Sequence, residues 1–360
     1  MDRVYDFSNA QLRPRTLGGS DRKIRVLFED KHYMLKFTDE HVKRGGLSTS
    51  HENNVFSEYI SSHIAQSIGL ETHNTVIGMY KDEICVGCED YRNNYTENLE
   101  FGEFLRMLYS SKDIKKIPLL SQIYEVYNSS VISDDLKKPA IQRFWDTFVV
   151  DALVGNFDRH TGNWGFLWDM KSDSISSLAP AYDFGSTLFP ALSDDSIGVI
   201  INQPKEILER CFVYPSPVMY LTKEKVGKPG YYDMLASNYD SECTKALLRV
   251  FPKIDIEKIN SIIDETPLIS QKRKAFYKEM ILHRYNLILK RAYFLCENEI
   301  YDEGALNRLK TGQSVTSKDV NDVYMNDISI IKSYEETHNL FKRNYTDEVN
   351  ENIAEYIQNL

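Results

Sequence analysis

The chain has 360 residues, of which 42% are apolar and 27% are charged, and its formal net charge is −10. These proportions are ordinary for a folded globular protein and exclude a disordered, collagen-like or coiled-coil chain. The acidic balance argues against general nucleic-acid binding, which needs clustered Lys and Arg. The longest apolar runs fall far short of the ~20 residues that a membrane-spanning helix needs.

The compartment can also be predicted from the sequence. Residues 1–15 contain charges and no apolar stretch, so we expect no secretory signal. Five cysteines are an odd and sparse number, which favours a reducing compartment over a disulfide framework. We therefore expect a cytoplasmic protein, and secretion as an effector stays open as an alternative.

The first ninety residues are rich in predicted strands. Between two strand pairs, apolar residues recur at helical spacing and predict one helix, with Ser50 as its N-cap and Gly69 at its end. The four runs typical of strands are Ile24–Phe28, His32–Phe37, Thr75–Tyr80 and Glu83–Gly87.

The pattern becomes helical from about Asn98 onward. A polar stretch, Glu303–Ser317, predicts a connector to a helical tail that carries an excess of acidic residues. The segments with helical periodicity are Phe101–Tyr109, Ile117–Val126, Ile141–Leu153 and much of Ser241–Glu299.

We therefore expect an α+β fold with two lobes and a tail. Residues 1–91 would form a small β-rich lobe with one helix. Residues 92–300 would form a larger, mostly helical lobe, and residues 301–360 the acidic helical tail.

The residues that carry chemistry are concentrated between Asp151 and Asp183. Asp158 is followed five residues later by Asn163, and Asp183 then begins an Asp-Phe-Gly sequence. Transfer of a γ-phosphoryl group needs metal ions held by hard oxygen ligands, which Asp carboxylates and Asn carbonyls supply. It also needs one carboxylate near the acceptor hydroxyl. This order of residues predicts a phosphotransferase.

A lysine should contact the nucleotide phosphates, and Lys36 suits this role. It lies on a predicted strand, where alternation places Met34 and Lys36 on one side, facing a cleft. Glu58 on the predicted helix is a candidate partner for Lys36, with Glu52 as a competitor. The loop before the strand contains Gly18-Gly19-Ser20 within a basic segment, which fits a local anion site.

For two further features we favour a structural role over a functional one. His160 lies beside Asp158 in a turn, and we expect it to be structural, because phosphoryl transfer of this kind needs no histidine. Cys85 and Cys88 have metal-like spacing, but the sequence has no second such pair. We expect them to be buried on a strand.

The segments Asn156–Trp164 and Ala179–Gly185 together resemble the signature of the HipA-like serine/threonine kinases. These are bacterial proteins with a kinase-like bilobal fold. The resemblance extends over about residues 15–295. It implies that Asp158 is the catalytic carboxylate and that Asn163 and Asp183 hold magnesium.

The resemblance also implies a nucleotide site. Lys36 would contact ATP, and a hinge containing Glu89 and Tyr91 would meet adenine through its backbone. Residues 16–23 are similar to the family's phosphate loop, which ends in a lysine and carries a hydroxyl that becomes phosphorylated. The loop residues expected to bind the nucleotide are Gly18, Gly19, Ser20 and Lys23.

Autophosphorylation of this loop is a second implication. Thr16 is the first candidate, because it matches the hydroxyl that the family modifies, and Ser20 is the second. The phosphate loop begins near residue 16, so the chain resembles a short form without the N-terminal subdomain that helps other members contact an antitoxin.

Family membership implies an ATP- and magnesium-dependent protein kinase with an unidentified protein substrate. It also leaves room for a toxin–antitoxin system and for an antitoxin or other regulatory partner. One alternative is a lipid or small-molecule kinase of the phosphoinositide-kinase type, which the net charge and the lack of a basic amphipathic helix disfavour. The other alternative is a non-catalytic scaffold. The presence of every expected polar residue argues against a scaffold.

Overall fold

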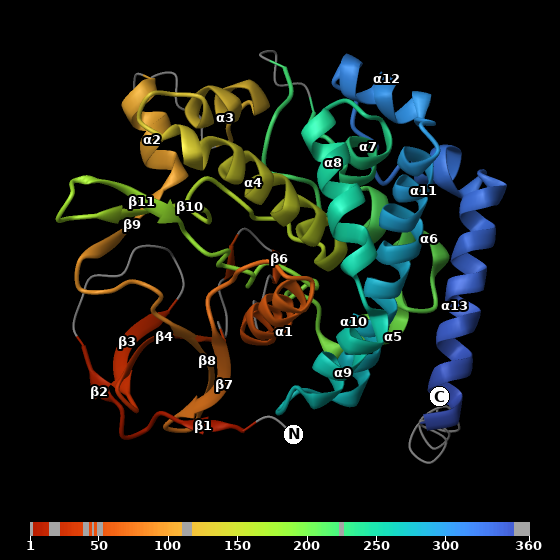
Figure 1. The fold of residues 1–360 in the computed structure, drawn as a ribbon. Helices are drawn as coiled ribbons and strands as arrows, with labels where there is room; N and C mark the ends of the chain where they lie inside the picture. The colour runs from red at the N-terminus through yellow and green to blue at the C-terminus, as the bar shows by residue number, and fades with distance from the viewer. Residues whose placement is uncertain are drawn as a thin grey trace.

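The protein is described from a computed structural model. The structure describes residues 3–13, 22–38, 43–44, 47–48, 53–109, 117–222 and 227–348. Thr16, Gly18, Gly19 and Ser20 of the predicted phosphate loop lie outside these ranges, as do Ser50 and Glu52. A small lobe built around a curled sheet lies beside a larger helical lobe, as the α+β prediction expected (Figure 1).

The small lobe is built on a six-stranded sheet with the order β1-β7-β8-β4-β3-β2. Only β1 and β7 pair in parallel; the other neighbours are antiparallel. All four predicted strands are confirmed, and two short edge strands were not predicted. The strands are β1 (Tyr5–Asp6), β2 (Gln11–Leu12), β3 (Lys23–Phe28), β4 (Lys31–Phe37), β7 (Thr75–Tyr80) and β8 (Glu83–Glu89).

The β3–β4 hairpin determines which side chains share one face of the sheet. Its two-residue turn, Glu29-Asp30, has positive φ at both positions (46° and 61°), the geometry that matches the twist of paired strands. In the resulting register Lys23 lies opposite Lys36. Directly paired residues point to the same face of a sheet, so both lysines face the same side.

The opposite face of the sheet closes around its own small core. Phe7 is fully buried there with Leu35 and Cys85. The Phe7 ring comes so close to β7 that a Cβ on Gly78 would lie 2.6 Å from it. Glycine is therefore required at residue 78 for the sheet to curl over this ring.

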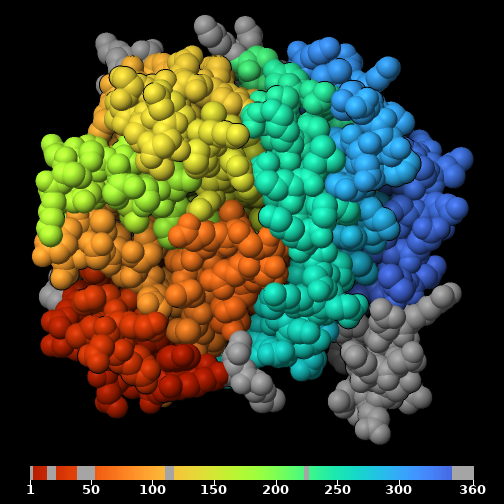
Figure 2. Space-filling view, viewed as in Figure 1, coloured from red at the N-terminus to blue at the C-terminus, as the bar shows by residue number. Residues whose placement is uncertain are grey.

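The predicted small-lobe helix is confirmed as α1 (Asn54–Ser67), and it ends before Gly69, whose φ is +90°. Its buried face packs on β7 and β8, and its other side contacts α9 of the large lobe. Figure 2 shows α1, in orange, wedged against the large lobe. The helix therefore touches both lobes, and its side chains can connect them.

The large lobe begins with a small sheet that the sequence analysis missed. Strands β9 (Thr96–Glu100), β10 (Gly165–Asp169) and β11 (Ser174–Leu178) form an antiparallel sheet in the order β11-β10-β9. The prediction that helices begin near Asn98 was therefore wrong by a few residues. Asn98 pairs with Leu167, a partner far along the chain that local periodicity cannot reveal.

The predicted helices of the large lobe, over 101–109, 117–126, 141–153 and 241–299, are confirmed with shifted bounds, whereas the three helices that the structure describes between residues 194 and 236 were not predicted. The pieces that precede the tail are α2 (Phe101–Leu108), α3 (Leu120–Tyr127), α4 (Asp134–Val154), α5 (Asp194–Ile200), α6 (Pro204–Phe212), α7 (Tyr231–Ala236), α8 (Ser241–Val250), α9 (Ile256–Glu265), α10 (Gln271–Arg284), a π-helical turn (Tyr285–Lys290) and α11 (Arg291–Glu297).

Helical structure begins earlier in the tail than expected. The predicted connector Glu303–Ser317 contains a helix, α12 (Glu303–Thr311), so that prediction was wrong. Asp302 caps the helix by accepting a hydrogen bond from the Ala305 N–H (2.8 Å). A second tail helix, α13 (Ile328–Glu348), lies along the outside of α10 (Figure 1).

Candidate active site

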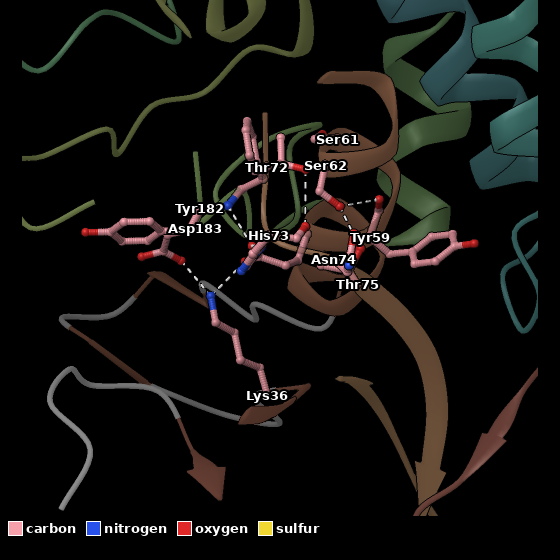
Figure 3. Close-up of polar contacts among 12 residues, drawn as sticks. Lys36, Tyr59, Ser61, Ser62, Thr72, His73, Asn74, Thr75, Tyr182 and Asp183 are labelled. Carbon is pink, nitrogen blue, oxygen red and sulfur yellow. Dashed lines mark hydrogen bonds and ion pairs between the residues drawn. The ribbon is translucent and has the colours of Figure 1, made fainter. Parts of the chain in front are cut away.

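Lys36 lies between the two lobes and connects them. Its Nζ donates to Glu58 Oε2 on α1 (2.7 Å) and to Asp183 Oδ1 (2.8 Å). Figure 3 shows Lys36 extending from β4 toward Asp183 and the region around His73. The predicted pairing of Lys36 with Glu58 is confirmed.

Glu58 is fully buried and holds three groups together. Its second oxygen, Oε1, lies 3.0 Å from His73 Nε2 and accepts the Phe184 N–H at 3.0 Å. Burial by itself would raise the pKa of Glu58, but the Lys36 charge and the His73 hydrogen bond outweigh burial and hold that pKa well below its usual range. The sequence analysis missed His73, which no motif marks.

The charge of Lys36 is also secured by its partners. Burial favours the neutral amine, but the carboxylates of Asp183 and Glu58 raise the pKa of Lys36 well above its usual value. The lysine is therefore a fixed cation where the two lobes meet. A fixed cation attracts anionic groups such as phosphates.

Asp183 has an unusual backbone for a non-glycine residue. Its φ is +62°, in the left-handed region that Asp tolerates better than most side chains. The side chain remains 38% exposed, although its neighbour Phe184 is fully buried. The side chain thus lies partly in solvent, with its Oδ1 at Lys36.

The segment from Asp158 to Asn163 forms a tight loop beside Asp183. The Asn163 side-chain N–H donates to the Asp158 carbonyl (2.8 Å), and the Asn163 main-chain N–H donates to the His160 carbonyl (2.9 Å). Asn163 is buried, whereas Asp158 is exposed. Within the described part of the chain, no donor occupies Asn163 Oδ1, so this oxygen can accept from or coordinate a ligand.

His160 shapes this loop. Its Nδ1 accepts the Gly162 N–H at 3.0 Å. A Cβ on Gly162 would lie 2.9 Å from the His160 ring, so the residue pair packs too closely for a larger side chain. These contacts agree with the structural role expected for His160.

Arg159 and Asp151 form a buried ion pair behind the loop. Arg159 Nε and Nη2 each donate to Asp151 at 2.9 Å, and the guanidinium also donates to the Tyr182 carbonyl. Asn156 donates to the same carboxylate (2.9 Å). This network fixes the loop to the segment that precedes Asp183. The sequence analysis gave Arg159 and Asp151 no role, although an Asp near the end of an apolar helix, followed by an Asp-Arg pair, was a usable signal.

The predicted hinge lies at the end of β8. The Glu89 N–H is taken by the Asn74 carbonyl (2.8 Å), so it cannot serve a ligand. The Glu89 side chain pairs with Lys31 at 3.0 Å. Tyr91 instead stacks on Tyr182, with ring centroids 6.0 Å apart, which brings the hinge next to the Asp183 segment.

Cys85 and Cys88 are buried on β8, as expected. They are three residues apart on a strand, so their side chains point to opposite faces and cannot share one metal ion. Cys85 belongs to the Phe7 core, whereas Cys88 lies near Glu58 and His73. Burial raises the pKa of the Cys85 thiol to about 12, so this thiol stays protonated.

Taken together, a strand lysine paired with a helix glutamate, an Asp-to-Asn loop and an Asp-Phe-Gly segment define a bilobal protein kinase. Residues 15–210 match the HipA-like C-terminal domain. The chain is 34% identical over 293 residues to the serine/threonine-protein kinase CtkA of Helicobacter pylori, which covers 81% of this chain and 88% of that protein.

A solved structure of a related kinase agrees with this assignment. A crystal structure of the Helicobacter pylori proinflammatory kinase CtkA matches with a TM-score of 0.75 and 32% identity, covering 83% of this chain and all of that one. The HipA, HipB and operator DNA complex of Shewanella oneidensis MR-1 matches at 16% identity with a TM-score of 0.49, covering 79% of this chain and 67% of that one.

The chain therefore belongs to the HipA-like family and is a serine/threonine protein kinase. Its substrate is accordingly a protein. Across the described ranges, none of the helices is both long and apolar enough to span a bilayer.

Proposed function

We propose that this kinase transfers the γ-phosphoryl group of ATP, in a magnesium-dependent reaction, to a serine or threonine hydroxyl of a protein. The observation that carries the proposal is the contact of Lys36 Nζ with both Glu58 and Asp183. In protein kinases the strand lysine and the helix glutamate must be paired for phosphoryl transfer. Here the pair is formed and the Asp183 carboxylate lies beside it.

Asn163 and Asp183 fit a magnesium site. Mg²⁺ prefers oxygen ligands and is held in kinases by one or two protein oxygens together with the nucleotide phosphates. Asp183 offers a half-exposed carboxylate, and Asn163 offers Oδ1 because its N–H is used internally. Bound magnesium would neutralise charge on the phosphates during transfer.

Asp158 is the proposed catalytic carboxylate. It is exposed at the loop whose shape is fixed by Asn163 and Arg159. The acceptor hydroxyl would give its proton to this carboxylate while its oxygen forms a bond to the γ-phosphorus. The bond from that phosphorus to the bridging oxygen would break, and ADP would leave.

The remaining nucleotide contacts are proposed from the positions of residues near Lys36 and Asp183. Lys36 would neutralise phosphate oxygens, and Lys23, which shares its face of the sheet, would add a second cation. Tyr91 is the better candidate for the adenine contact, because the Glu89 N–H already has a partner. Gly18, Gly19 and Ser20 are proposed to cover the phosphates.

Calorimetry with Mg-ATP and Asp183→Ala tests the nucleotide and metal assignment. Loss of the charged ligand should abolish the gain in ATP affinity that magnesium gives to the wild type. Asp135→Ala, an exposed acid at the start of α4, is the matched control and should bind as the wild type does. Unchanged magnesium-dependent binding by Asp183→Ala would contradict the assignment.

Autophosphorylation of the phosphate loop at Thr16, or secondarily at Ser20, is proposed to switch the enzyme off. A phosphate adds about −1.5 to −2 charges at pH 7, which would repel ATP. Mass spectrometry of wild-type and Asp158→Asn protein tests it. The loop peptide of active protein should carry phosphate, and the phosphorylated form should bind ATP poorly; an unmodified loop would contradict the proposal.

The cellular partners are proposed from the family resemblance. The phosphorylated protein is unidentified, and an antitoxin or another regulatory protein is the expected second partner. Incubation with labelled ATP, followed by separation of labelled protein from labelled lipid, distinguishes this proposal from a lipid kinase. Label in lipid alone would favour the phosphoinositide-kinase-like alternative.

A further inference from the structure

A second cluster of potential metal ligands lies away from Lys36 and Asp183. It is found where the tail helix α13 packs on α10. Glu279 and His283 are one turn apart on α10, and His338 reaches them from α13. His338 Nδ1 lies 2.7 Å from Glu279 Oε1, and His283 Nε2 lies 3.6 Å from the same oxygen. One ligand atom from each residue lies within 4.8 Å of the other two.

This cluster contains buried polar atoms that lack partners. Glu279 and His283 are fully buried, and Glu279 Oε2, His283 Nδ1 and His283 Nε2 make no hydrogen bond in the described structure. A buried polar atom without a partner typically costs about 1–3 kcal/mol, and native structures rarely keep several together. The pair formed by His338 and Glu279 satisfies only one carboxylate oxygen.

We propose that Glu279, His283 and His338 bind one divalent transition-metal ion, with zinc as the expected occupant, and that the ion fastens α13 to α10. Two imidazoles and one carboxylate form a common zinc ligand set. Zinc bonds of about 2.0–2.1 Å in tetrahedral geometry separate ligand atoms by about 3.3 Å. The observed separations of 2.7 and 3.6 Å bracket this value.

The surroundings suit a metal. Zinc binds imidazole nitrogen, and both ring nitrogens of the buried His283 are available to it. Tyr334 stacks on the His283 ring (centroids 4.9 Å apart, planes at 14°) and limits its rotation. His338 is 16% exposed, so one edge of the cluster borders solvent.

The competing occupant is a proton. A protonated His338 would form an ion pair with Glu279, but it would leave both His283 nitrogens without a partner. A metal would bond His283 Nε2 directly. The two possibilities can be distinguished by zinc titration, because only a metal site would bind added zinc.

Metal titration of the full-length, tag-free protein decides between them. After removal of metal with EDTA, zinc would be titrated in competition with a chromogenic chelator, and cobalt would serve as a spectroscopic probe. The wild type should bind one more tight equivalent than His338→Ala and should show the intense visible absorption of tetrahedral cobalt. The variant should bind this equivalent at least about 100-fold more weakly, since even loss of an outer-shell group costs 10- to 100-fold.

Asn339→Ala, the exposed neighbour on α13, is the matched control and should bind as the wild type does. Glu58, His73 and Cys88 form another metal-competent group near the cleft. That group is present in all three proteins, so the difference between them reports the α10–α13 site alone. Zinc should also raise the melting temperature of the wild type and of the control by more than it raises that of His338→Ala. Equal stoichiometry and affinity in the wild type and His338→Ala would overturn the proposal.

Discussion

Asp158 is the proposed catalytic carboxylate, so the proposed transfer step would depend on its single negative charge. Asp158→Asn keeps the size of the side chain and removes its ability to accept a proton. A positioned general base contributes about 10²- to 10⁴-fold, so the turnover number of the variant should fall by that factor while Mg-ATP affinity stays close to wild type. Steady-state kinetics and calorimetry measure the two quantities. Turnover within about twofold of wild type would place the base elsewhere.

Asp151 supports the loop that contains Asp158 by forming an ion pair with Arg159. Asp151→Asn leaves a buried guanidinium with neutral partners only, and breaking such a buried ion pair typically costs about 3–5 kcal/mol. We expect a loss of this size in the free energy of unfolding, measured in urea, together with lower activity. Asp135→Asn, at an exposed position, should change stability by less than about 0.5 kcal/mol. A loss below about 1 kcal/mol for Asp151→Asn would show that Arg159 finds another partner.

At the scale of elements, the sequence predicted segments whose signal is local. The β3–β4 hairpin could be predicted because a short polar turn separates two runs of strand-forming residues. β9 could not, because its partner β10 lies more than sixty residues further along the chain. α12 was missed because only Ala305 and Leu309 are buried in an otherwise polar helix. Such a helix is stabilised by tertiary packing that periodicity does not reveal.

The corrected assignment of α12 has a measurable consequence. Leu309 is 2% exposed, and Leu→Ala at a buried position typically costs about 2–5 kcal/mol. Leu309→Ala should therefore lower the free energy of unfolding by that amount in urea titrations. Leu340→Ala removes the same atoms at a site that is 48% exposed and should cost less than about 1 kcal/mol. Equal effects of the two variants would mean that residues 303–317 are a connector after all.

At the scale of the whole molecule, the sequence order of the site motifs was enough to expect that Lys36 and Asp183 serve one site. The two residues are 147 positions apart in the chain, yet their side chains are in contact. His73 and Asp151 were not assigned roles, because they contact the site residues from behind and belong to no motif. Residues of this kind act through tertiary contacts. Those contacts cannot be predicted from the pattern of a single sequence.

Glu58 joins both lobes, so its ionisation should affect the stability of the whole chain. Its pKa is lowered in the folded protein, chiefly because Lys36 and His73 outweigh the effect of burial. A group with a lowered folded pKa stabilises the protein above its unfolded pKa, near 4.3, and this stabilisation is lost as the pH falls toward the folded pKa.

Wild type should therefore be more stable than Glu58→Gln by an amount that stays constant from pH 8 to about pH 5.5. Below about pH 4 the difference should shrink by up to about 1.4 kcal/mol per pH unit, the limit for one proton. Urea unfolding at pH 7, 6, 5, 4 and 3 measures it, since the other carboxylates titrate in both proteins and cancel. Glu257→Gln, an exposed acid on α9, is the control and should show a small, flat difference. A difference between wild type and Glu58→Gln that is the same at pH 7 and pH 3 would mean that the Lys36–Glu58 pair does not depend on the Glu58 charge.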